Sequence, residues 1–343
     1  MMKKNMLKKL MALTCAGAMS LSLAACGSAN DAQSSGGSDD AAKDGIRIGV
    51  LQYATHPSLD NCYKGVLQGL EEAGYVDGEN GVKITFQNAN GNGSDADMMA
   101  KTLASSSDLL IAVATPAAMS CYSAAKDSDI PVIYTAASDP LGAGLAKDLN
   151  NPQTGASGTK DALNLEGQMK MIRAMLPDAK TIGILYTTSE PNSLAHLETF
   201  KSLAPDYGFT IEAVGITNES EVAAGAATLV AKGVDCVNNF TDNNVVNNLS
   251  TLLHATDAAG IPVFGSEEEQ VRNGCVAAES MDYVALGAQT GKMAADILSG
   301  KADIMTMPVF VSEKTDPVYS AANCEKFGIV IPDAYADAIN LDE

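Results

Sequence analysis

The strongest constraint on the fold of this chain is an order of strand, polar loop and helix that occurs twice. The segment TIGILYTTSEPNS, residues 181–193, aligns with RIGVLQYATHPSL, residues 47–59, at an offset of 134 positions. The alignment superposes glycine, leucine and proline residues: Gly49 on Gly183, Leu51 on Leu185 and Pro57 on Pro191. DLLIAVATPAA and DIPVIYTAASDP recur in the same order as DCVNNFTDNNV and GIPVFGSEEEQ. This repeat predicts two similar lobes in tandem, with a chance alignment of apolar strands as the alternative.

Within each repeat, short apolar runs alternate with amphipathic stretches. IRIGVLQ is typical of a strand, and LDNCYKGVLQGLEEAG places apolar residues at the three- and four-residue spacings of a helix that ends at Gly74. A regular βαβ order is typical of a parallel sheet covered by helices on both faces. The sequence therefore predicts an α/β fold with two doubly wound parallel-sheet lobes joined by a hinge.

The predicted lobes define the expected domains. We expect lobe 1 over residues 46–160, together with part of 283–343 crossing back, and lobe 2 over residues 161–300. Residues 301–343 are expected to form a C-terminal crossover segment. Residues 46–343 are more than a single hydrophobic core usually supports, which agrees with two domains.

The N-terminal residues predict where the protein is located. Four lysines precede the apolar run LMALTCAGAMSLSL, which ends in LAAC, and this pattern indicates a lipoprotein signal peptide over residues 1–25 with lipidation at Cys26. The run is shorter than the roughly 20 residues of a membrane-spanning helix. Residues 26–45 are rich in Gly, Ser and Asp and are expected to be a flexible linker. We therefore expect an extracytoplasmic protein that is lipid-anchored to the cell membrane.

Charge and cysteine content exclude several classes of protein. Removal of residues 1–25, which carry four lysines and no acids, takes the formal charge from −20 to −24. Such an acidic surface repels phosphate backbones, so nucleic acid is not an expected partner. Seven cysteines without a CxxC pair and three histidines without HExxH predict neither a metal site nor a disulfide framework, and no cofactor is expected.

Polar side chains follow the predicted strands, in the loops where an open parallel sheet binds its ligand. Hydroxyl groups beside helix N-termini suit a carboxylate: Thr115, Ser138, Ser193 and Thr241. Acceptors suit an ammonium group: Asp139, Glu190, Asp242, Asn243 and Glu267. Both sets together predict a zwitterion held between the lobes, with Asp242 accepting from its ammonium group. Helix capping alone is the alternative at each position.

The loop QYATHPSLDNC does not have the spacing of a catalytic centre. Ser58, His56 and Asp60 are two residues apart in a tight loop, so they cannot align as nucleophile, base and orienting acid. The chain has no GxSxG motif. We expect no enzyme; His56 is then a ligand contact or a structural loop residue, and a secreted hydrolase is the alternative that requires turnover dependent on His56.

Several strings in this order and spacing resemble one family. HPSLD, GLEEAGYVDGEN, TPAA, SDPLGAGL, LYTTSEPNS, TDNNVV and IPVFGSEEEQVRNG are similar to the ABC transporter substrate-binding lipoproteins of the tryptophan/tyrosine type. The resemblance covers nearly everything from Ile46 to the end. It implies a periplasmic-binding-protein fold of type I with three crossovers, and delivery of a small solute to an ABC permease in the membrane.

The same resemblance implies which residues bind the ligand. They are Gln52, Tyr53, His56, Thr115, Ser138, Asp139, Asp161, Glu190, Asn192, Ser193, Asp242, Asn243 and Glu267. Asp161 stands at the crossover, where the family often has a Ser-Asp pair and where Lys160 here replaces the serine. Four aromatic side chains are candidates for stacking on an aromatic amino acid: Tyr53, Tyr134, Tyr186 and Phe240. We expect a monomer; a sensory lipoprotein that signals to a membrane receptor and a solute other than an amino acid remain open.

Overall fold

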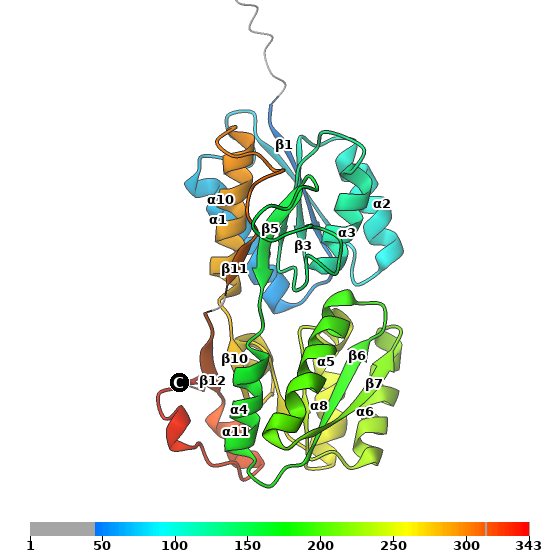
Figure 1. Cartoon of the computed structure of the whole chain (residues 1–343), viewed down its shortest axis with the longest axis vertical. Coiled ribbons are helices and arrows are strands. Elements are labelled where there is room, and N and C mark those ends of the chain that lie inside the picture. The colour runs from blue at the N-terminus through cyan, green and yellow to red at the C-terminus, as the bar shows by residue number, and fades with distance from the viewer. Residues whose placement is uncertain (1–44, 313, 343) are drawn as a thin grey trace, which may run out of the picture. The chain divides into compact units, whose positions relative to one another are not determined.

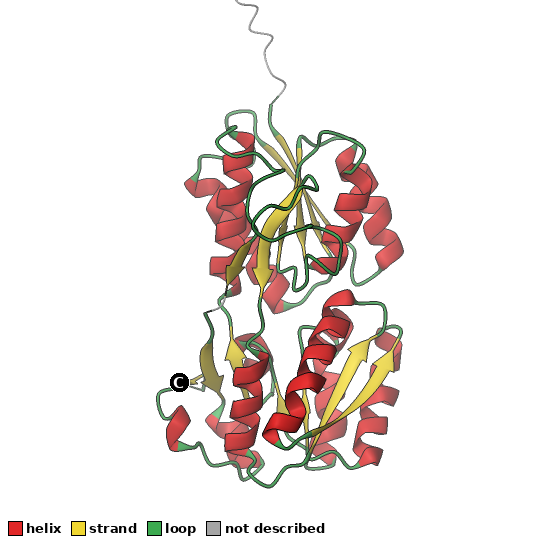
Figure 2. Cartoon of the chain, in the orientation of Figure 1, coloured by secondary structure: helices red, strands yellow, loops and turns green. Residues whose placement is uncertain are grey.

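The computed structural model describes residues 45–312 and 314–342. The predicted signal peptide, the lipidation site Cys26 and all but the last residue of the predicted linker lie outside the described residues. The described residues form two separate parallel sheets with helices on both faces, as Figures 1 and 2 show. The predicted α/β class with two doubly wound lobes is therefore confirmed.

The first lobe contains a six-stranded parallel sheet in the order β11-β5-β4-β3-β1-β2. Its strands are β1 (Arg47–Gln52), β2 (Lys83–Asn88), β3 (Leu109–Val113), β4 (Val132–Thr135), β5 (Ala156–Asp161) and β11 (Phe310–Ser312). Helices α1 (Pro57–Glu72) and α10 (Tyr283–Leu298) cover one face, and α2 (Gly93–Ala104) and α3 (Thr115–Ala125) cover the other. The central strands β3 and β4 are buried along their whole length, which their apolar sequences explain.

The second lobe contains a four-stranded parallel sheet in the order β7-β6-β8-β9. Its strands are β6 (Thr181–Thr187), β7 (Thr210–Ile216), β8 (Cys236–Asn238) and β9 (Val263–Phe264). A smaller sheet, β10-β12-β13, adds β10 (Ala277–Ser280), β12 (Asp316–Tyr319) and β13 (Ile339–Asn340). The helices are α4 (Leu165–Met175), α5 (Pro191–Leu203), α6 (Val222–Lys232), α7 (Asn243–Asn247), α8 (Leu249–Ala258), α9 (Glu268–Arg272) and α11 (Ala321–Lys326), with 3₁₀ turns at Ala204–Tyr207, Glu219–Glu221 and Asp333–Tyr335.

The repeat seen in the sequence corresponds to equivalent elements of the two lobes. Strands β1 and β6 occupy the same position in the order of their sheets, each between the next two strands of the chain. Helices α1 and α5 follow these strands and begin at Pro57 and Pro191, the prolines that the alignment superposes. Proline suits this first helical position because it has no backbone N–H to leave unpaired.

Three segments connect the lobes. The chain passes from β5 into α4, returns from β10 into α10, and leaves again between β11 and β12. The last strands of the chain are thus divided, because β11 pairs with β5 in the first lobe and β12 pairs with β10 in the second. Whether residues 46–160 and 161–300 are independent domains stays a prediction.

Helices α1 and α10 pack unusually closely, and glycines on both helices make this packing fit. A Cβ atom on Gly65 or Gly69 would overlap a backbone carbonyl oxygen of α10. One on Gly287 or Gly291 would in turn overlap a carbonyl oxygen of α1. The contact fixes α1 rigidly to the first lobe.

Replacing Gly69 by alanine is expected to lower the free energy of unfolding by about 1–3 kcal/mol, because the added methyl group forces two backbones apart. Gly93→Ala is the matched control, because a Cβ at Gly93 in α2 meets open space. The control should change stability by less than about 0.5 kcal/mol. Urea unfolding of both variants measures the difference, and equal midpoints would contradict close packing at this contact.

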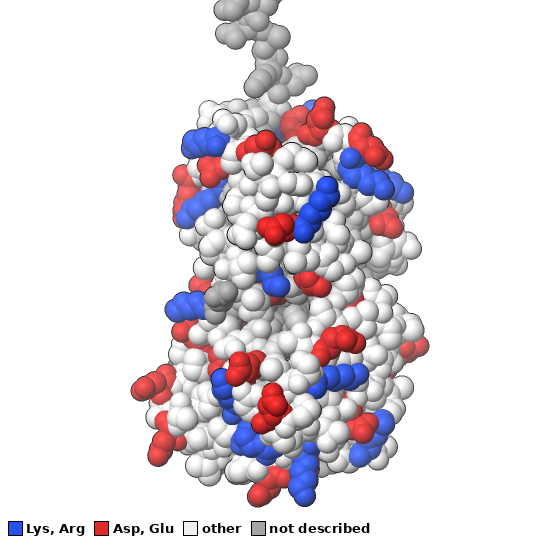
Figure 3. Space-filling model, viewed as in Figure 1, with Lys and Arg blue, Asp and Glu red and all other residues white. Residues whose placement is uncertain are grey.

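Charged side chains are spread over the surface of the body. Acidic and basic residues are interspersed on the face that Figure 3 shows, and neither sign forms a continuous patch there. In the described residues no helix is long and apolar enough to span a membrane.

Candidate functional site

A cavity, which we call the central cavity, lies between the strand-end loops of the two lobes. Its volume is about 20 Å³, far below the roughly 300–1,000 Å³ typical of small-molecule sites, so its walls must move apart to admit a solute. Its lining residues are His56, Ser58, Leu59, Ala114, Thr115, Ala136, Ser138, Asp161, Asn192, Thr241, Asn243 and Tyr283. Both lobes and the crossover segments contribute, so a solute inside would be enclosed by both.

Seven of the residues predicted from the sequence line the central cavity: His56, Thr115, Ser138, Asp161, Asn192, Thr241 and Asn243. Seven do not: Gln52, Tyr53, Asp139, Glu190, Ser193, Asp242 and Glu267. The side chains of these seven make contacts elsewhere. Gln52 donates to the Ala54 carbonyl (2.8 Å) and to Asp60 (2.7 Å), and Tyr53 donates to the Gly91 carbonyl (2.9 Å). Asp139 accepts from the amide of Gly142 at 3.0 Å.

The first lobe presents small residues and hydroxyls to the central cavity. Ala114 and Ala136 follow β3 and β4 and have positive φ angles of 82° and 53°, which cost energy in a residue with a Cβ. This turn geometry leads directly into α3, whose first amides have no side-chain cap. Thr115 Oγ1 accepts from the amide of Ser138 at 3.2 Å, which holds the two hydroxyl-bearing loops together. The uncapped N-terminus of α3 favours negative charge at this wall.

His56 crosses from the first lobe to the second. It precedes α1 in an extended conformation, and its Nε2 lies 3.3 Å from Asn243 Oδ1. Burial lowers the pKa of His56 to about 4, against the hydrogen bond to Asn243 and the nearby Asp60, which raise it. The imidazole is therefore neutral at pH 7, and donation from Nε2 leaves Nδ1 as a buried acceptor without a partner.

Asp161 is a buried acid at the first crossover. One carboxylate oxygen accepts from the Tyr283 hydroxyl at 3.4 Å, and the other, Oδ1, is buried without a partner. Burial raises the pKa of Asp161 to about 6, so most of the carboxyl groups are ionised at pH 7. Lys160, which precedes it, does not line the central cavity. An unpartnered carboxylate at a cavity wall suits a cationic group.

Asp242 has no free acceptor directed at the cavity. It caps α7 by accepting from the amide of Val245 (3.1 Å), and it also accepts from the Thr187 amide (2.6 Å), the Thr187 hydroxyl (2.8 Å) and the Ser193 hydroxyl (2.7 Å). These bonds join β6, α5 and α7 within one lobe. Asp242 thus caps α7, the alternative at this position, and its contact with a ligand stays a prediction.

Glu190 lies behind the residues of the second lobe that line the cavity. Its Oε2 accepts from the Asn243 amide (3.1 Å), from Asn243 Nδ2 (2.7 Å) and from Asn192 Nδ2 (3.1 Å). Burial, and secondly the charge of Asp242, raise the pKa of Glu190 to about 8. Glu190 thus orients Asn192 and Asn243, whose side chains form the cavity wall.

The aromatic side chain at the cavity is one that the sequence reasoning missed. Tyr283 lines the cavity, whereas the four candidates named from the sequence do not. Tyr134 is fully buried in the first lobe, and Phe240 packs edge-on against Phe200 at 5.3 Å. Tyr283 is the first residue of α10 and follows a crossover. It does not lie in a loop after a strand of the repeat, so the repeat did not indicate it. Leu59, Ala114 and Ala136 were missed because their side chains are apolar, and Ser58 was considered only as a nucleophile.

The described residues contain no group of three or more His, Cys, Asp or Glu side chains placed to hold a metal ion. All five cysteines of the described chain are buried and unpaired. Burial raises the pKa of Cys324 to about 11 and that of Cys121 to about 12, so these thiols are poor nucleophiles.

Comparison with known proteins agrees with this architecture. Residues 47–338 match the family described as ABC transporter substrate binding protein. A "Tyrosine-binding protein" from Clostridioides difficile (strain R20291) is 35% identical over 312 residues, which cover 90% of this chain and 89% of that protein. The family consists of solute-binding proteins, which confirms the expectation that the chain is no enzyme.

Two solved structures with equal identity differ in how well they superpose. The structure of an ABC domain in complex with L-Trp from Streptococcus pneumonia is 36% identical and has a TM-score of 0.82. A ligand-free, open structure of a substrate-binding protein with adhesive properties from Clostridium difficile is also 36% identical but has a TM-score of 0.64. Each comparison covers 86% of this chain and 98% of the other. This chain therefore superposes better on the complex with L-Trp, and it belongs to the ABC transporter substrate-binding protein family.

Proposed function

We propose that this protein captures an α-amino acid with an aromatic side chain, of the tyrosine or tryptophan kind, in the central cavity and passes it to an ABC permease. The observation that carries the proposal is a cavity between two lobes whose walls hold both an uncapped helix N-terminus and a carboxylate with one unpartnered oxygen. A zwitterion needs both groups. The names of the relatives that bind tyrosine and L-Trp support the aromatic side chain.

The two ends of the ligand are assigned to different walls. The carboxylate is proposed to lie at the N-terminus of α3, with the hydroxyls of Thr115 and Ser138 as donors. The ammonium group is proposed to donate to Asp161 Oδ1 and to Asn192 Oδ1, both of which are buried without a partner. Tyr283 and Leu59 supply the apolar surface for the ring. His56 and Asn243 complete the wall and stay in the proposed ligand contacts.

The location and the partners belong to the same proposal. The predicted signal peptide and Cys26 support an extracytoplasmic lipoprotein held at the membrane by its lipid. The family supports a permease as the receiver of the solute, since its members are described as substrate-binding proteins of ABC transporters.

Calorimetric titration tests the ligand. L-Tyrosine and L-tryptophan are expected to give saturable heat with one site per chain. N-acetyl-L-tyrosine, which lacks the ammonium group, and L-tyrosinamide, which lacks the carboxylate, should each bind at least about tenfold more weakly because each leaves a buried polar group unpaired. Equal affinity for the amino acid and both analogues would rule out recognition of a zwitterion, and no heat with any amino acid would remove the ligand assignment.

A further inference from the structure

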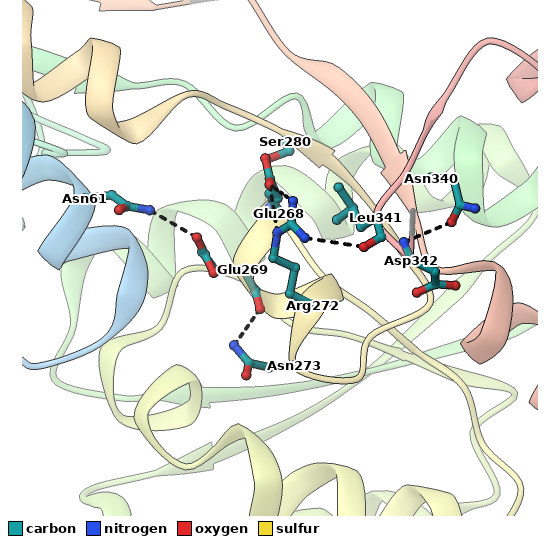
Figure 4. Close-up of polar contacts among 9 residues, drawn as sticks. All are labelled: Asn61, Glu268, Glu269, Arg272, Asn273, Ser280, Asn340, Leu341 and Asp342. Atoms are coloured by element: carbon teal, nitrogen blue, oxygen red, sulfur yellow. Dashed lines mark hydrogen bonds and ion pairs between the residues drawn. The ribbon is translucent and has the colours of Figure 1, made fainter.

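The first turns of α1 reach across to the second lobe through three side chains. His56 contacts Asn243 at 3.3 Å, the Ser58 hydroxyl donates to Glu267, and Asn61 Nδ2 donates to Glu269 Oε1 at 3.2 Å. Figure 4 shows Asn61 on α1 pointing to Glu269 on α9. We call these six residues the interlobe latch. The hydrogen bonds between these residues hold α1 against the second lobe when the lobes are closed.

Both sides of the interlobe latch are fixed within their own lobes. On the first side, the glycine contacts described above pack α1 against α10. On the second side, α9 is held by its own neighbours: the Glu268 amide donates to Ser280 Oγ (2.7 Å), and Arg272 pairs with Glu268 (2.6 Å) and donates to the Leu341 carbonyl (3.3 Å). When the lobes open, the hydrogen bonds of the interlobe latch therefore break, because α1 and α9 each stay packed in their own lobe.

Glu267 is the buried centre of the latch. Its side chain is 1% exposed and is not among the residues that line the central cavity. One carboxylate oxygen accepts from Ser58, and the other is buried without a partner. We propose that the interlobe latch sets the population of the closed form and thereby the affinity for the ligand. Closure of the lobes is coupled to protonation of the Glu267 side chain. This inference rests on the proposed function for its affinity readout.

The direction of the proton effect follows from the surroundings of Glu267. Burial raises the pKa of Glu267 to about 7, and the nearby carboxylates of Glu269 and Asp161 raise it further, against the hydrogen bond from Ser58 and the nearby side chain of Gln270. Other titratable groups that face it come from three further segments: Cys62 of α1, Tyr283 of α10, and Cys275. Opening returns the carboxyl to water and to a lower pKa. The closed form thus binds the proton more tightly, so closure is favoured below pH 7 and weakens as the pH rises through 7.

Two substitutions at Glu267 distinguish the effect of its hydrogen bond with Ser58 from the effect of its protonation. Glu267→Ala removes both and is expected to weaken binding of L-tyrosine by at least about tenfold, since a bond to a buried charged group is lost. Glu267→Gln keeps an acceptor for Ser58 and stays neutral without taking up a proton, so at pH 6 it should bind at least as tightly as the wild type. Glu268→Gln is the matched control, because Glu268 pairs only within its own lobe.

The measurement uses the full chain with one fluorophore on each lobe, in single-molecule energy transfer between pH 6 and pH 8, with and without L-tyrosine. The wild type and Glu268→Gln should show a larger closed fraction at pH 6 than at pH 8, and Glu267→Gln should show a smaller dependence on pH. An unchanged closed fraction in Glu267→Ala, or an unchanged pH profile in Glu267→Gln, overturns the inference. Because the closed fraction without ligand is recorded as well, failure of L-tyrosine to bind is a separate result that concerns the proposed function alone.

Discussion

Replacement of Asp242 by alanine is expected to lower the free energy of unfolding by at least about 3 kcal/mol, because it leaves several buried donors without an acceptor. These are the amides of Thr187 and Val245 and the hydroxyls of Thr187 and Ser193, which tie β6, α5 and α7 together. Loss of the side chain thus loosens three elements of the second lobe at once. Urea unfolding followed by circular dichroism measures the change.

Asp282→Ala is the control for this loss. Asp282 is also a helix cap, but it is exposed and accepts from a single amide, that of Ala285 at 2.9 Å. Its loss should cost about 1 kcal/mol, the usual value of an N-cap. Similar losses in the two variants would show that the bonds of Asp242 beyond its cap add nothing. A folded Asp242→Ala variant with wild-type stability and weakened ligand binding would restore the prediction that Asp242 accepts from the ammonium group.

Substitution of Asp161 by asparagine is expected to weaken binding of L-tyrosine by about 10- to 100-fold, because a charge-assisted hydrogen bond to the ammonium group is replaced by a neutral one. The change is nearly isosteric, and asparagine can still accept from Tyr283. Stability should change little compared with affinity, since removal of the charge also removes the cost of burying it. Calorimetric titration of the variant with L-tyrosine measures the loss.

Asp127→Asn makes the same chemical change at an exposed residue after α3 and should bind within about twofold of the wild type. Its result separates an effect of the Asp161 site from a general effect of one negative charge fewer. If Asp161→Asn binds as tightly as Asp127→Asn, the ammonium group lies elsewhere in the cavity.

Much of the fold could be predicted because the sequence repeats its local signals. The prolines at positions 57 and 191 mark equivalent helix starts after equivalent strands, and the structure has α1 and α5 beginning there. The pairing of β11 with β5 could not be predicted from the local sequence, because a strand of three residues does not indicate which of the two sheets it joins.

The site was harder to predict than the fold, because capping and ligand binding use the same residue types at the same loop positions. Asp161 and Asp242 are both buried acids at the ends of strands or the starts of helices. The structure separates them by their partners: Asp242 accepts four hydrogen bonds within its lobe, whereas one oxygen of Asp161 has none. Such partners are distant in the sequence. The position of Glu267 is a similar case, because its bond to Ser58 joins residues 209 positions apart.

The glycine-mediated contact between α1 and α10 also affects how the chain can fold as it is synthesised. Helix α1 is made early, but the helix that covers its glycines and the strand β11 at the sheet edge are made only after most of the second lobe. A nascent chain that ends before residue 283 has a continuous sequence for the second lobe's four-stranded sheet but an unfinished first lobe. Completion of the first lobe therefore waits for the C-terminal fifth of the polypeptide.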